Sequence, residues 1–306
     1  MILIRMKYIL SPKVNYSGNV VTADRIASFF DDVKIVDKDY KCFEKNDIII
    51  GLNAYKVGKL LINRNYNFFI IVTGTDLNCD FFDQEKKKII LEVFKQAKKI
   101  IVFNLYQKKI LLKNNFNSII IPQSVDIDLP TNNFNLRDYL NIKHNISKIF
   151  LLVGNLRKVK DPFFLIDEFK KLYDELGYIF IYIGSNLDNY DLNKYYIKHI
   201  DGLDSVSTYT AIKQSNGLIN TSLSEGMASS ILEAMSLKCP IYARINNSNE
   251  YIIKHNYNGY LFKDKIDFLQ IIEKNSDKNI IENAFDDIKN KYSKSLEKSE
   301  YVKLFK

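Results

Sequence analysis

Short apolar runs alternate with amphipathic stretches along the whole chain, and this alternation limits the possible folds more than any other feature. Each apolar run has the length of one buried strand, and the stretches between the runs have helical periodicity. This pattern is typical of an α/β domain with a mostly parallel sheet. Strands are expected at 1–10, 33–36, 47–52, 68–73, 99–103 and 118–121. Helices are expected at 22–30, with Thr22 as the N-cap, and at 86–98.

The pattern restarts after a loop-like stretch, residues 122–145, which contains Pro122, Pro130 and several asparagines. A helix over 162–176 has one apolar stripe, and Gly177 is expected to end it. The last residues form a charged helix whose expected apolar face is Tyr292, Leu296 and Tyr301. Further strands are expected at 148–153, 178–183, 195–200, 217–220 and 240–242. The length of 306 residues suits two such domains.

Composition excludes several classes of protein. Hydrophobic residues make up 46% of the chain and charged residues 26%, which favours folded domains over disorder. No apolar run approaches the roughly 20 residues of a membrane span, and the N-terminus lacks the pattern of a signal peptide. Cys42, Cys79 and Cys239 lie far apart, and none of the three histidines stands at ligand spacing from them. We therefore expect a reducing cytoplasmic location and no metal site.

The formal net charge is +8, and two interpretations compete. A basic protein attracts anions such as a nucleoside diphosphate, an anionic membrane surface or a nucleic acid. Alternatively, the lysines reflect a general bias toward Lys, Asn, Ile, Tyr and Phe. We favour the bias for the basic runs 86–88, 98–99 and 108–109, which lack the interleaved aromatic residues of a single-strand-binding groove.

The most specific segment is 220–235, which reads NTSLSEGMASSILEAM. Glu225 precedes a helix next to Gly226, and Glu233 follows eight positions later within that helix. A helix N-terminus offers unpaired N–H groups that suit a pyrophosphate, and a carboxylate can accept hydrogen bonds from sugar hydroxyl pairs. Gly226 would let the backbone approach a ligand closely. The alternative is structural, because Ser230 and Glu233 also fit a capping box.

A second segment, 154–162, reads GNLRKVKDP and directly follows an expected strand. Arg157 offers a fork of donors that matches phosphate oxygens, and Lys160 offers a point charge. From spacing alone, an ordinary solvated surface remains the alternative.

Together the two segments resemble family 4 (group 1) of the retaining glycosyltransferases, which have the GT-B fold. The resemblance implies that Glu225 of the E-x7-E motif contacts the donor sugar and Glu233 the ribose of the nucleotide. It also implies that Arg157 and Lys160 bind the donor diphosphate. The backbone groups near the sugar and the phosphates would be those of Gly226, Met227 and Ala228.

The resemblance continues outside these motifs. Residues 243–262 resemble the segment after the E-x7-E helix, and 17–26 and 73–80 resemble first-domain segments of the glycosyltransferase 1 domain-containing subgroup. It implies that Gly18 faces the phosphates. Asp76 is either an acceptor-side catalytic contact or a turn residue. The chain departs from the pattern because no histidine precedes His144, whereas many family members have one in the catalytic cleft.

The resemblance therefore implies two Rossmann-like domains that face a cleft, at 1–130 and 131–288, with a helix at about 289–306 that crosses back to the first domain. The implied activity is retaining transfer of a sugar from a nucleotide diphosphate sugar to a glycan, lipid, protein or small metabolite. We expect no required metal or other cofactor, no nucleic-acid partner and a cytoplasmic location, with peripheral contact at the inner membrane surface left open. The alternatives are a non-catalytic nucleotide-sugar-binding protein, a nucleic-acid binder and an epimerase on the same fold.

Overall fold

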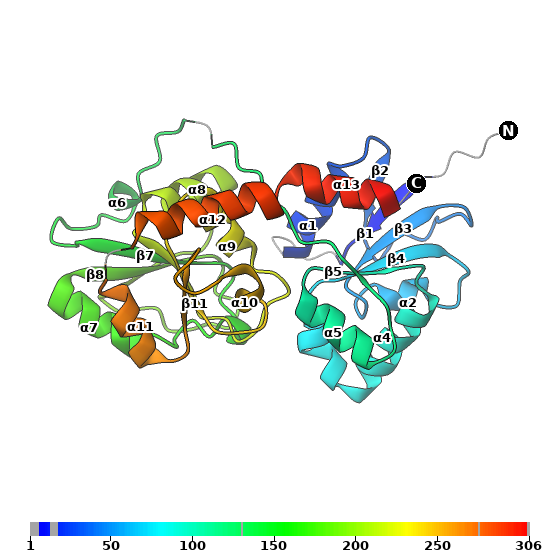
Figure 1. Cartoon of the computed structure of the whole chain (residues 1–306), viewed down its shortest axis with the longest axis horizontal. Helices are drawn as coiled ribbons and strands as arrows, with labels where there is room; N and C mark the ends of the chain where they lie inside the picture. The colour runs from blue at the N-terminus through cyan, green and yellow to red at the C-terminus, as the bar shows by residue number, and fades with distance from the viewer. Residues whose placement is uncertain (1–5, 13–17, 130, 275, 305–306) are drawn as a thin grey trace. The chain divides into compact units, whose positions relative to one another are not determined.

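The computed structural model describes residues 6–12, 18–129, 131–274 and 276–304. The chain forms two compact units (Figure 1). The first contains residues 1–123, 225–227 and 295–306, and the second contains residues 124–224 and 228–294. The units therefore divide after Gln123 and after Lys294, a few residues from the boundaries expected at 130 and 288.

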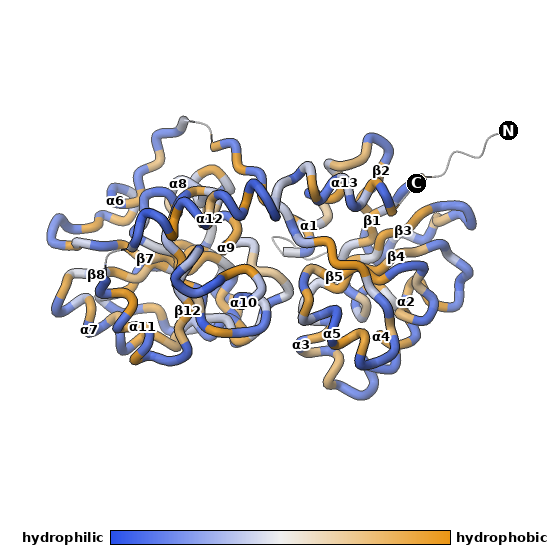
Figure 2. The backbone as a smooth tube through the Cα atoms, viewed as in Figure 1, coloured by the Kyte–Doolittle hydropathy of each residue, from blue (hydrophilic) through white to orange (hydrophobic). Residues whose placement is uncertain are grey.

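The first unit contains a six-stranded sheet in the order β2-β1-β3-β4-β5-β6, and all its strand pairs are parallel. Every residue of β3 and all but the first residue of β4 are buried, as expected for a parallel sheet covered on both faces. Figure 2 shows the apolar residues gathered on these strands. The strands are β1 Lys7–Leu10, β2 Val33–Val36, β3 Ile48–Leu52, β4 Asn67–Val72, β5 Ile100–Val102 and β6 Ile119–Ile120. All six expected strands are thus present, although residues 1–5 of the first lie outside the described residues.

Two helices of the first unit, those that begin at Gln84 and Leu105, follow polar residues that cap them. The Asp83 side chain accepts hydrogen bonds from the backbone N–H groups of Glu85 and Lys86, and Asn104 accepts one from Gln107. The expectation that Thr22 is an N-cap is wrong, because the helix already begins at Gly18 and the Thr22 hydroxyl donates to the Gly18 carbonyl at 2.8 Å. The helices are α1 Gly18–Ala27, α2 Gly58–Leu61, α3 Thr75–Asn78, α4 Gln84–Gln96, α5 Leu105–Lys113 and α13 Lys294–Leu304.

The C-terminal helix α13 packs against α1 within the first unit. Arg25 Nε donates to Glu297 Oε2 at 3.0 Å, and the Glu297 residue is only 3% exposed. Tyr301 is fully buried, with its ring centroid 5.9 Å from that of Phe29. The expected apolar face is partly wrong, because Leu296 is exposed and Tyr292 is the C-cap of the preceding helix.

The second unit contains another six-stranded parallel sheet, in the order β12-β11-β10-β7-β8-β9. Its strands are β7 Lys148–Val153, β8 Tyr178–Ile183, β9 Ile197–Ile200, β10 Gly217–Asn220, β11 Ile241–Arg244 and β12 Tyr260–Phe262. Its helices are α6 Leu136–Tyr139, α7 Ile166–Leu176, α8 Ser205–Gln214, α9 Ser229–Ser236, α10 Asn249–Ile252, α11 Lys265–Ile272 and α12 Lys278–Lys291. Five strands were expected, and β12 was not.

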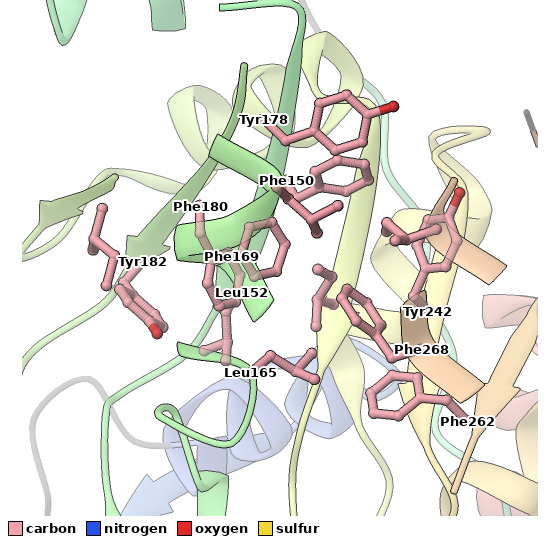
Figure 3. Packing of buried hydrophobic residues seen from close by; sticks show 14 of the residues in the cluster. Phe150, Leu152, Leu165, Phe169, Tyr178, Phe180, Tyr182, Tyr242, Phe262 and Phe268 are labelled. Carbon is pink, nitrogen blue, oxygen red and sulfur yellow. The ribbon is translucent and has the colours of Figure 1, made fainter. Parts of the chain in front are cut away.

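Aromatic side chains fill the core between this sheet and the helices α7 and α11 (Figure 3). The rings of Phe169 on α7 and Phe180 on β8 stack with centroids 4.2 Å apart, and Phe268 on α11 packs against Phe169 at 5.8 Å. Each buried ring contributes on the order of 2 kcal/mol through the hydrophobic effect. Gly177 ends α7 with a left-handed φ of 67°, as expected. The strands that lead to the site are therefore held in a well-packed core.

None of the helices among the described residues combines the length and the hydrophobicity that a membrane span requires.

Candidate functional site

The order of the second sheet reverses between β7 and β10. From β7 the chain builds outward through β8 to β9, and from β10 it builds in the other direction through β11 to β12. Open α/β sheets bind ligands beyond the carboxyl ends of their strands at such a reversal. The loop after β7 and the loop after β10 contain the two motifs found in the sequence.

The loop after β7, residues 154–161, is held on one side by the loop after β8. Leu156 N–H donates to the Ser185 carbonyl at 2.8 Å, and Lys158 N–H donates to Asp188 Oδ2 at 2.6 Å. Gly184 has a φ of 139°, and a Cβ on it would lie 2.5 Å from the Gly154 carbonyl oxygen. Glycine is therefore required at position 184 for the two loops to approach this closely.

The loop after β10 holds residues 154–161 from the other side. Leu223 N–H donates to the Val159 carbonyl at 2.9 Å, and the Thr221 hydroxyl donates to the Lys160 carbonyl at 2.7 Å. Thr221 is fully buried, so its hydrogen bond is shielded from water. Backbone groups on both sides thus fix the segment that contains the predicted phosphate-binding cations.

Arg157 and Lys160 present their charges from this fixed segment. Arg157 is exposed and forms no ion pair with any carboxylate of the described residues. Lys160 Nζ lies 3.8 Å from the position that a Cβ on Gly154 would take, so its ammonium group folds back over that glycine. The two cations therefore share one short turn at the carboxyl end of β7.

Arg244, at the end of β11, anchors the same segment, and sequence analysis assigned it no role. Its Nη1 donates to Asp161 Oδ2 at 2.7 Å, and its guanidinium carbon lies 3.8 Å from the ring centroid of Phe164. Asp161 adopts a left-handed φ of 44° at the end of the turn that contains Lys160. The ion pair and the ring contact together hold the end of the phosphate-binding segment.

Asparagines shape the loop after β10, and they too were not predicted; Asn220 and Asn249 are buried, and Asn246 is half-buried. Asn249 Nδ2 donates to Asn220 Oδ1 at 3.1 Å and to the Arg244 carbonyl at 2.9 Å. Asn246 Nδ2 donates to the Ser222 carbonyl at 2.9 Å. Asn220 ends β10 at the reversal of the sheet, and this position is the signal that could have identified it, whereas Asn249 begins α10 five residues after β11 and gives no such signal.

Helix α9 begins at Ser229, and its N-cap Ala228 makes no side-chain capping hydrogen bond. Ser230 lies inside the helix, so the capping-box alternative for Ser230 and Glu233 is wrong. The first turn of α9 thus has backbone N–H groups that no side chain of the N-cap satisfies. Glu233 is half-buried on α9. Burial of Tyr209 on α8, together with the negative charge of Glu233, raises the pKa of Tyr209 to about 12.

Glu225, Gly226 and Met227 group with the first unit. Asn78 Nδ2 donates to the Glu225 carbonyl at 3.0 Å, and Asn104 Nδ2 donates to the Gly226 carbonyl at 2.6 Å. The Glu225 residue is half-buried and lies in a loop ahead of α9, as expected. Gly18 is the first residue of α1, and a Cβ on it would meet no atom within 4 Å.

Asp76 is fully buried at the carboxyl edge of the first sheet. Its Oδ1 accepts hydrogen bonds from Asn53 Nδ2 at 2.7 Å and from the Thr73 hydroxyl at 3.0 Å, and its Oδ2 accepts one from Ala54 N–H at 2.6 Å. Burial raises the pKa of Asp76, while the backbone donors of Ala54 and Gly74 and the Thr73 hydroxyl act against this rise. Asp76 thus ties the loops after β3 and β4 together.

The structure brings Arg157 and Lys160 to the loop between β7 and α7, next to the loop that leads to Glu225 and Glu233. Asp76 and Gly18 lie in the first unit, with which Glu225 also groups, whereas Arg157, Lys160 and Glu233 lie in the second. Among the described residues, no group of three or more His, Cys, Asp or Glu side chains is arranged to hold a metal ion.

Known proteins resemble both the motifs and the fold. A model of the family "Glycosyl transferases group 1" matches residues 139–289. Glycosyltransferase 1 domain-containing protein 1 of Xenopus tropicalis is 27% identical over 94% of this chain and 94% of its own length. Both comparisons agree with the resemblance seen in the motifs.

Solved structures share the fold at low identity. Anabaena HepE in complex with UDP-glucose matches with a TM-score of 0.81 and 14% identity, over 98% of this chain and 99% of its own. Sucrose-phosphate synthase of Thermosynechococcus elongatus matches with a TM-score of 0.75 and 11% identity, over 98% of each chain. Residues 139–289 therefore match the group 1 glycosyltransferase family, and the chain as a whole has the GT-B fold.

Proposed function

We propose that the chain transfers a sugar from a nucleoside diphosphate sugar to an acceptor with retention of the anomeric configuration. The observation that supports it best is the fixed 154–161 segment, which presents Arg157 and Lys160 at the reversal of the second sheet. HepE, a structural neighbour, was solved with UDP-glucose and with UDP, so uridine nucleotides are the first donors to test.

Departure of the nucleoside diphosphate is the step that these cations would assist. The bond between the sugar and the diphosphate breaks, and negative charge develops on the leaving phosphate. Preorganised cations and N–H groups stabilise such charge without reorganisation during the reaction. In our proposal Arg157, Lys160 and the first turn of α9 supply them, and transfer requires no divalent ion.

The two glutamates would bind the hydroxyl groups of the donor. Glu225 contacts the transferred sugar and Glu233 the ribose, because each carboxylate can accept hydrogen bonds from a pair of hydroxyls. The charge of Glu233 raises the pKa of Tyr209 on α8, so the two side chains lie near each other and α8 would border the ribose side of the site. Gly226, Met227 and Ala228 would contribute backbone groups near the sugar and phosphates.

The acceptor would bind to the first unit. The catalytic contact that sequence analysis considered for Asp76, as the alternative to a turn residue, would require an Asp76 oxygen to exchange one of its present partners for the acceptor hydroxyl. A cytoplasmic location is part of the same proposal, in keeping with the three cysteines, all of which are free thiols. The acceptor itself remains one of four classes: glycan, lipid, protein or small metabolite.

A thermal-shift screen tests the donor site first. The purified chain is mixed with UDP, GDP, ADP, CMP and their sugars, with EDTA present, because a ligand that binds only the folded state raises the melting temperature. We expect one nucleoside diphosphate to give a selective shift that the Arg157→Ala variant loses and the neighbouring Lys158→Ala variant retains.

Three outcomes would contradict the proposal or one part of it. No shift with any nucleotide at millimolar concentration would mean that the motifs do not bind a donor. A selective shift without any transfer or hydrolysis of the matching sugar donor would favour a non-catalytic nucleotide-sugar-binding protein. A shift that appears only after Mg²⁺ replaces EDTA would overturn the metal-independent part.

A further inference from the structure

The positive charge of the chain is concentrated in one stretch. Between Glu92 and Asp126 there is no acidic residue, and there are six lysines. This stretch therefore accounts for six of the formal net charge of +8. A general compositional bias would spread lysines and acids alike, whereas here the acids are missing from a single segment.

Helix α5 lies within this stretch and exposes a mixed basic and apolar face. Leu105, Lys109, Leu112 and Lys113 follow at helical spacing, which places them on one side of the helix. Lys109 and Lys113 are exposed, and Leu105 and Leu112 are 44% and 47% exposed. Gln107 and Leu111 are buried on the opposite side, against the sheet. Exposed leucines at this spacing have no role in the core of the unit.

Two further lysines lie at the amino end of the sheet, toward which α5 runs. Lys98 and Lys99 are exposed immediately before β5, and α5 runs back antiparallel to β5 and ends at Lys113. The ring of Phe116, just after α5, packs against Phe94 of α4 with centroids 5.5 Å apart (Figure 1 shows both helices). We call Lys98, Lys99, Leu105, Lys108, Lys109, Leu112 and Lys113 the α5 patch.

The lysines of the α5 patch differ from those of the neighbouring helix α4. On α4, Lys88 pairs with Glu85 at 2.6 Å and Lys95 pairs with Glu92 at 3.5 Å. Lysines 98, 99, 108, 109 and 113 form no ion pair with any carboxylate in the part of the chain that the structure describes. Their charge is therefore available to an external anion.

We propose that the α5 patch docks the protein on the surface of an anionic lipid membrane. Basic side chains beside exposed apolar ones on one helix face are the combination that binds such an interface, with the apolar groups in the headgroup region and the cations at the lipid phosphates. The stretch between Glu92 and Asp126 contains no arginine, and leucines offer no stacking surface for a base. These features favour lipid over nucleic acid. The inference goes beyond the proposed glycosyl transfer.

Docking would also orient the first unit. Leu105 begins α5 immediately after the carboxyl end of β5, at the same edge of the sheet as Asn53 and Asp76. A membrane bound to the α5 patch would therefore lie beside the edge at which we expect the acceptor. A lipid-linked acceptor would fit this arrangement best.

Vesicle flotation tests the proposal with the full chain and without any nucleotide, so the result does not depend on donor binding. Vesicles contain either phosphatidylcholine alone or phosphatidylcholine with about a third phosphatidylglycerol. We expect binding to the anionic vesicles only, and weaker binding as salt rises. The K109Q/K113Q variant should lose about thirtyfold in partitioning, since each lysine near an anionic surface contributes about fivefold.

Matched variants separate charge, insertion and folding. K171Q/K274Q removes two exposed lysines of the second unit and should bind within about twofold of wild type. L105S/L112S should lose about tenfold or more while keeping its salt dependence, because serine does not enter the headgroup region. Circular dichroism and melting temperature check that each variant is folded.

Three results would overturn the proposal. One is equal partitioning of K109Q/K113Q and K171Q/K274Q. Another is full binding by L105S/L112S, which would exclude insertion of the leucines. The third is tighter binding to a DNA duplex than to anionic vesicles through the same lysines, which would assign the α5 patch to nucleic acid.

Discussion

The two sheets have the same parallel construction, yet the loops at their carboxyl edges are stabilised in opposite ways. In the second unit, backbone groups and small side chains fix the loop after β7, and Arg157 stays exposed. In the first unit, the side chains of Asn53 and Asp76 themselves hold the loops together and are fully buried. The second edge therefore leaves Arg157 exposed toward a ligand, whereas the first edge uses Asn53 and Asp76 internally.

The difference between the two edges shows when a polar residue at the end of a strand can be taken to indicate a binding site. A charged side chain at the carboxyl edge indicates a binding site only where its hydrogen-bonding capacity is not already satisfied by the loop. Asp76 Oδ1 accepts hydrogen bonds from two side chains, and Asp76 Oδ2 accepts one from the backbone N–H of Ala54. Asp76 therefore links the loops after β3 and β4. The comparison predicts large functional effects at the second edge and large stability effects at the first.

The largest expected effect is at Glu225. Glu225→Gln removes the charge that we propose contacts the transferred sugar, so kcat/KM for transfer should fall about a hundredfold or more. The affinity for the nucleoside diphosphate should change less than about threefold, because the glutamate does not contact the phosphates. Steady-state kinetics and calorimetry measure the two quantities. Glu250→Gln, at an exposed site on α10, is the matched control. Equal losses of transfer and of nucleoside diphosphate affinity would show that Glu225 does not specifically contact the transferred sugar.

Arg157→Ala should have the next largest effect. Loss of a charge-assisted hydrogen bond to phosphate costs about 1.5–3 kcal/mol, so the dissociation constant for the diphosphate should rise roughly ten- to a hundredfold. Binding of the bare nucleoside should change less than about twofold. Calorimetry with both ligands measures the difference, and Lys158→Ala, one residue away and also exposed, serves as the control. A parallel loss for nucleoside and nucleoside diphosphate would show that Arg157 does not face the phosphates.

Asp76→Asn should reduce stability more than catalysis. The amide nitrogen of asparagine would face a donor, either Ala54 N–H or the Asn53 and Thr73 groups, in place of an accepting oxygen. The free energy of unfolding should therefore fall by about 1–3 kcal/mol. Denaturant unfolding measures the loss, with Asp31→Asn at an exposed position as the control.

Transfer by the folded fraction of the Asp76→Asn variant should stay within about threefold of wild type. A hundredfold fall in kcat with unchanged stability would instead establish Asp76 as an acceptor-side catalytic contact, which sequence analysis left open against the turn interpretation. The same variant thus decides between the two interpretations of the first edge.

Much of the fold follows from local patterns in the sequence. Strands such as 48–52 and 178–183 are continuous apolar runs because the sheet is covered on both faces, and such runs are visible without tertiary information. β12 was missed because Tyr260–Phe262 is too short to form a recognisable run. Thr22 misled the prediction of a helix start, because a threonine hydroxyl bonds backward to a carbonyl within a helix as readily as it caps one.

Only part of the site could be predicted from the sequence, again because local patterns are visible there and long-range contacts are not. Arg157 and Lys160 stand in the loop that directly follows an apolar strand, so their place at the sheet edge is a local property. The partner of Arg244 is Asp161, 83 residues earlier, and Asn249 bonds to Asn220, 29 residues earlier. Such pairs depend on the order of the strands in the sheet, and no local pattern records that order.

The smallest expected effect tests whether the anchor by Arg244 matters to the second edge. Arg244→Lys keeps the positive charge that faces Asp161 but loses the planar guanidinium that lies on the Phe164 ring. Because the side chains are partly exposed, we expect a loss of only about 0.5–1 kcal/mol in the free energy of unfolding. A slightly displaced 154–161 segment should weaken nucleoside diphosphate binding about two- to threefold. Denaturant unfolding and calorimetry measure both, with the exposed Arg64→Lys as the control.

The Arg244→Lys result bears directly on how the two edges differ. If diphosphate affinity falls together with stability, the second edge also depends on a side-chain contact, that of Arg244 with Asp161. This contact would then be weaker and more peripheral than the hydrogen bonds of Asp76 at the first edge. If stability falls and affinity does not, the hydrogen bonds from Thr221 and Leu223 suffice to position Arg157 and Lys160. An affinity loss larger than that of Arg157→Ala would contradict the assignment itself, because a residue that only supports the loop cannot matter more than the cation it supports.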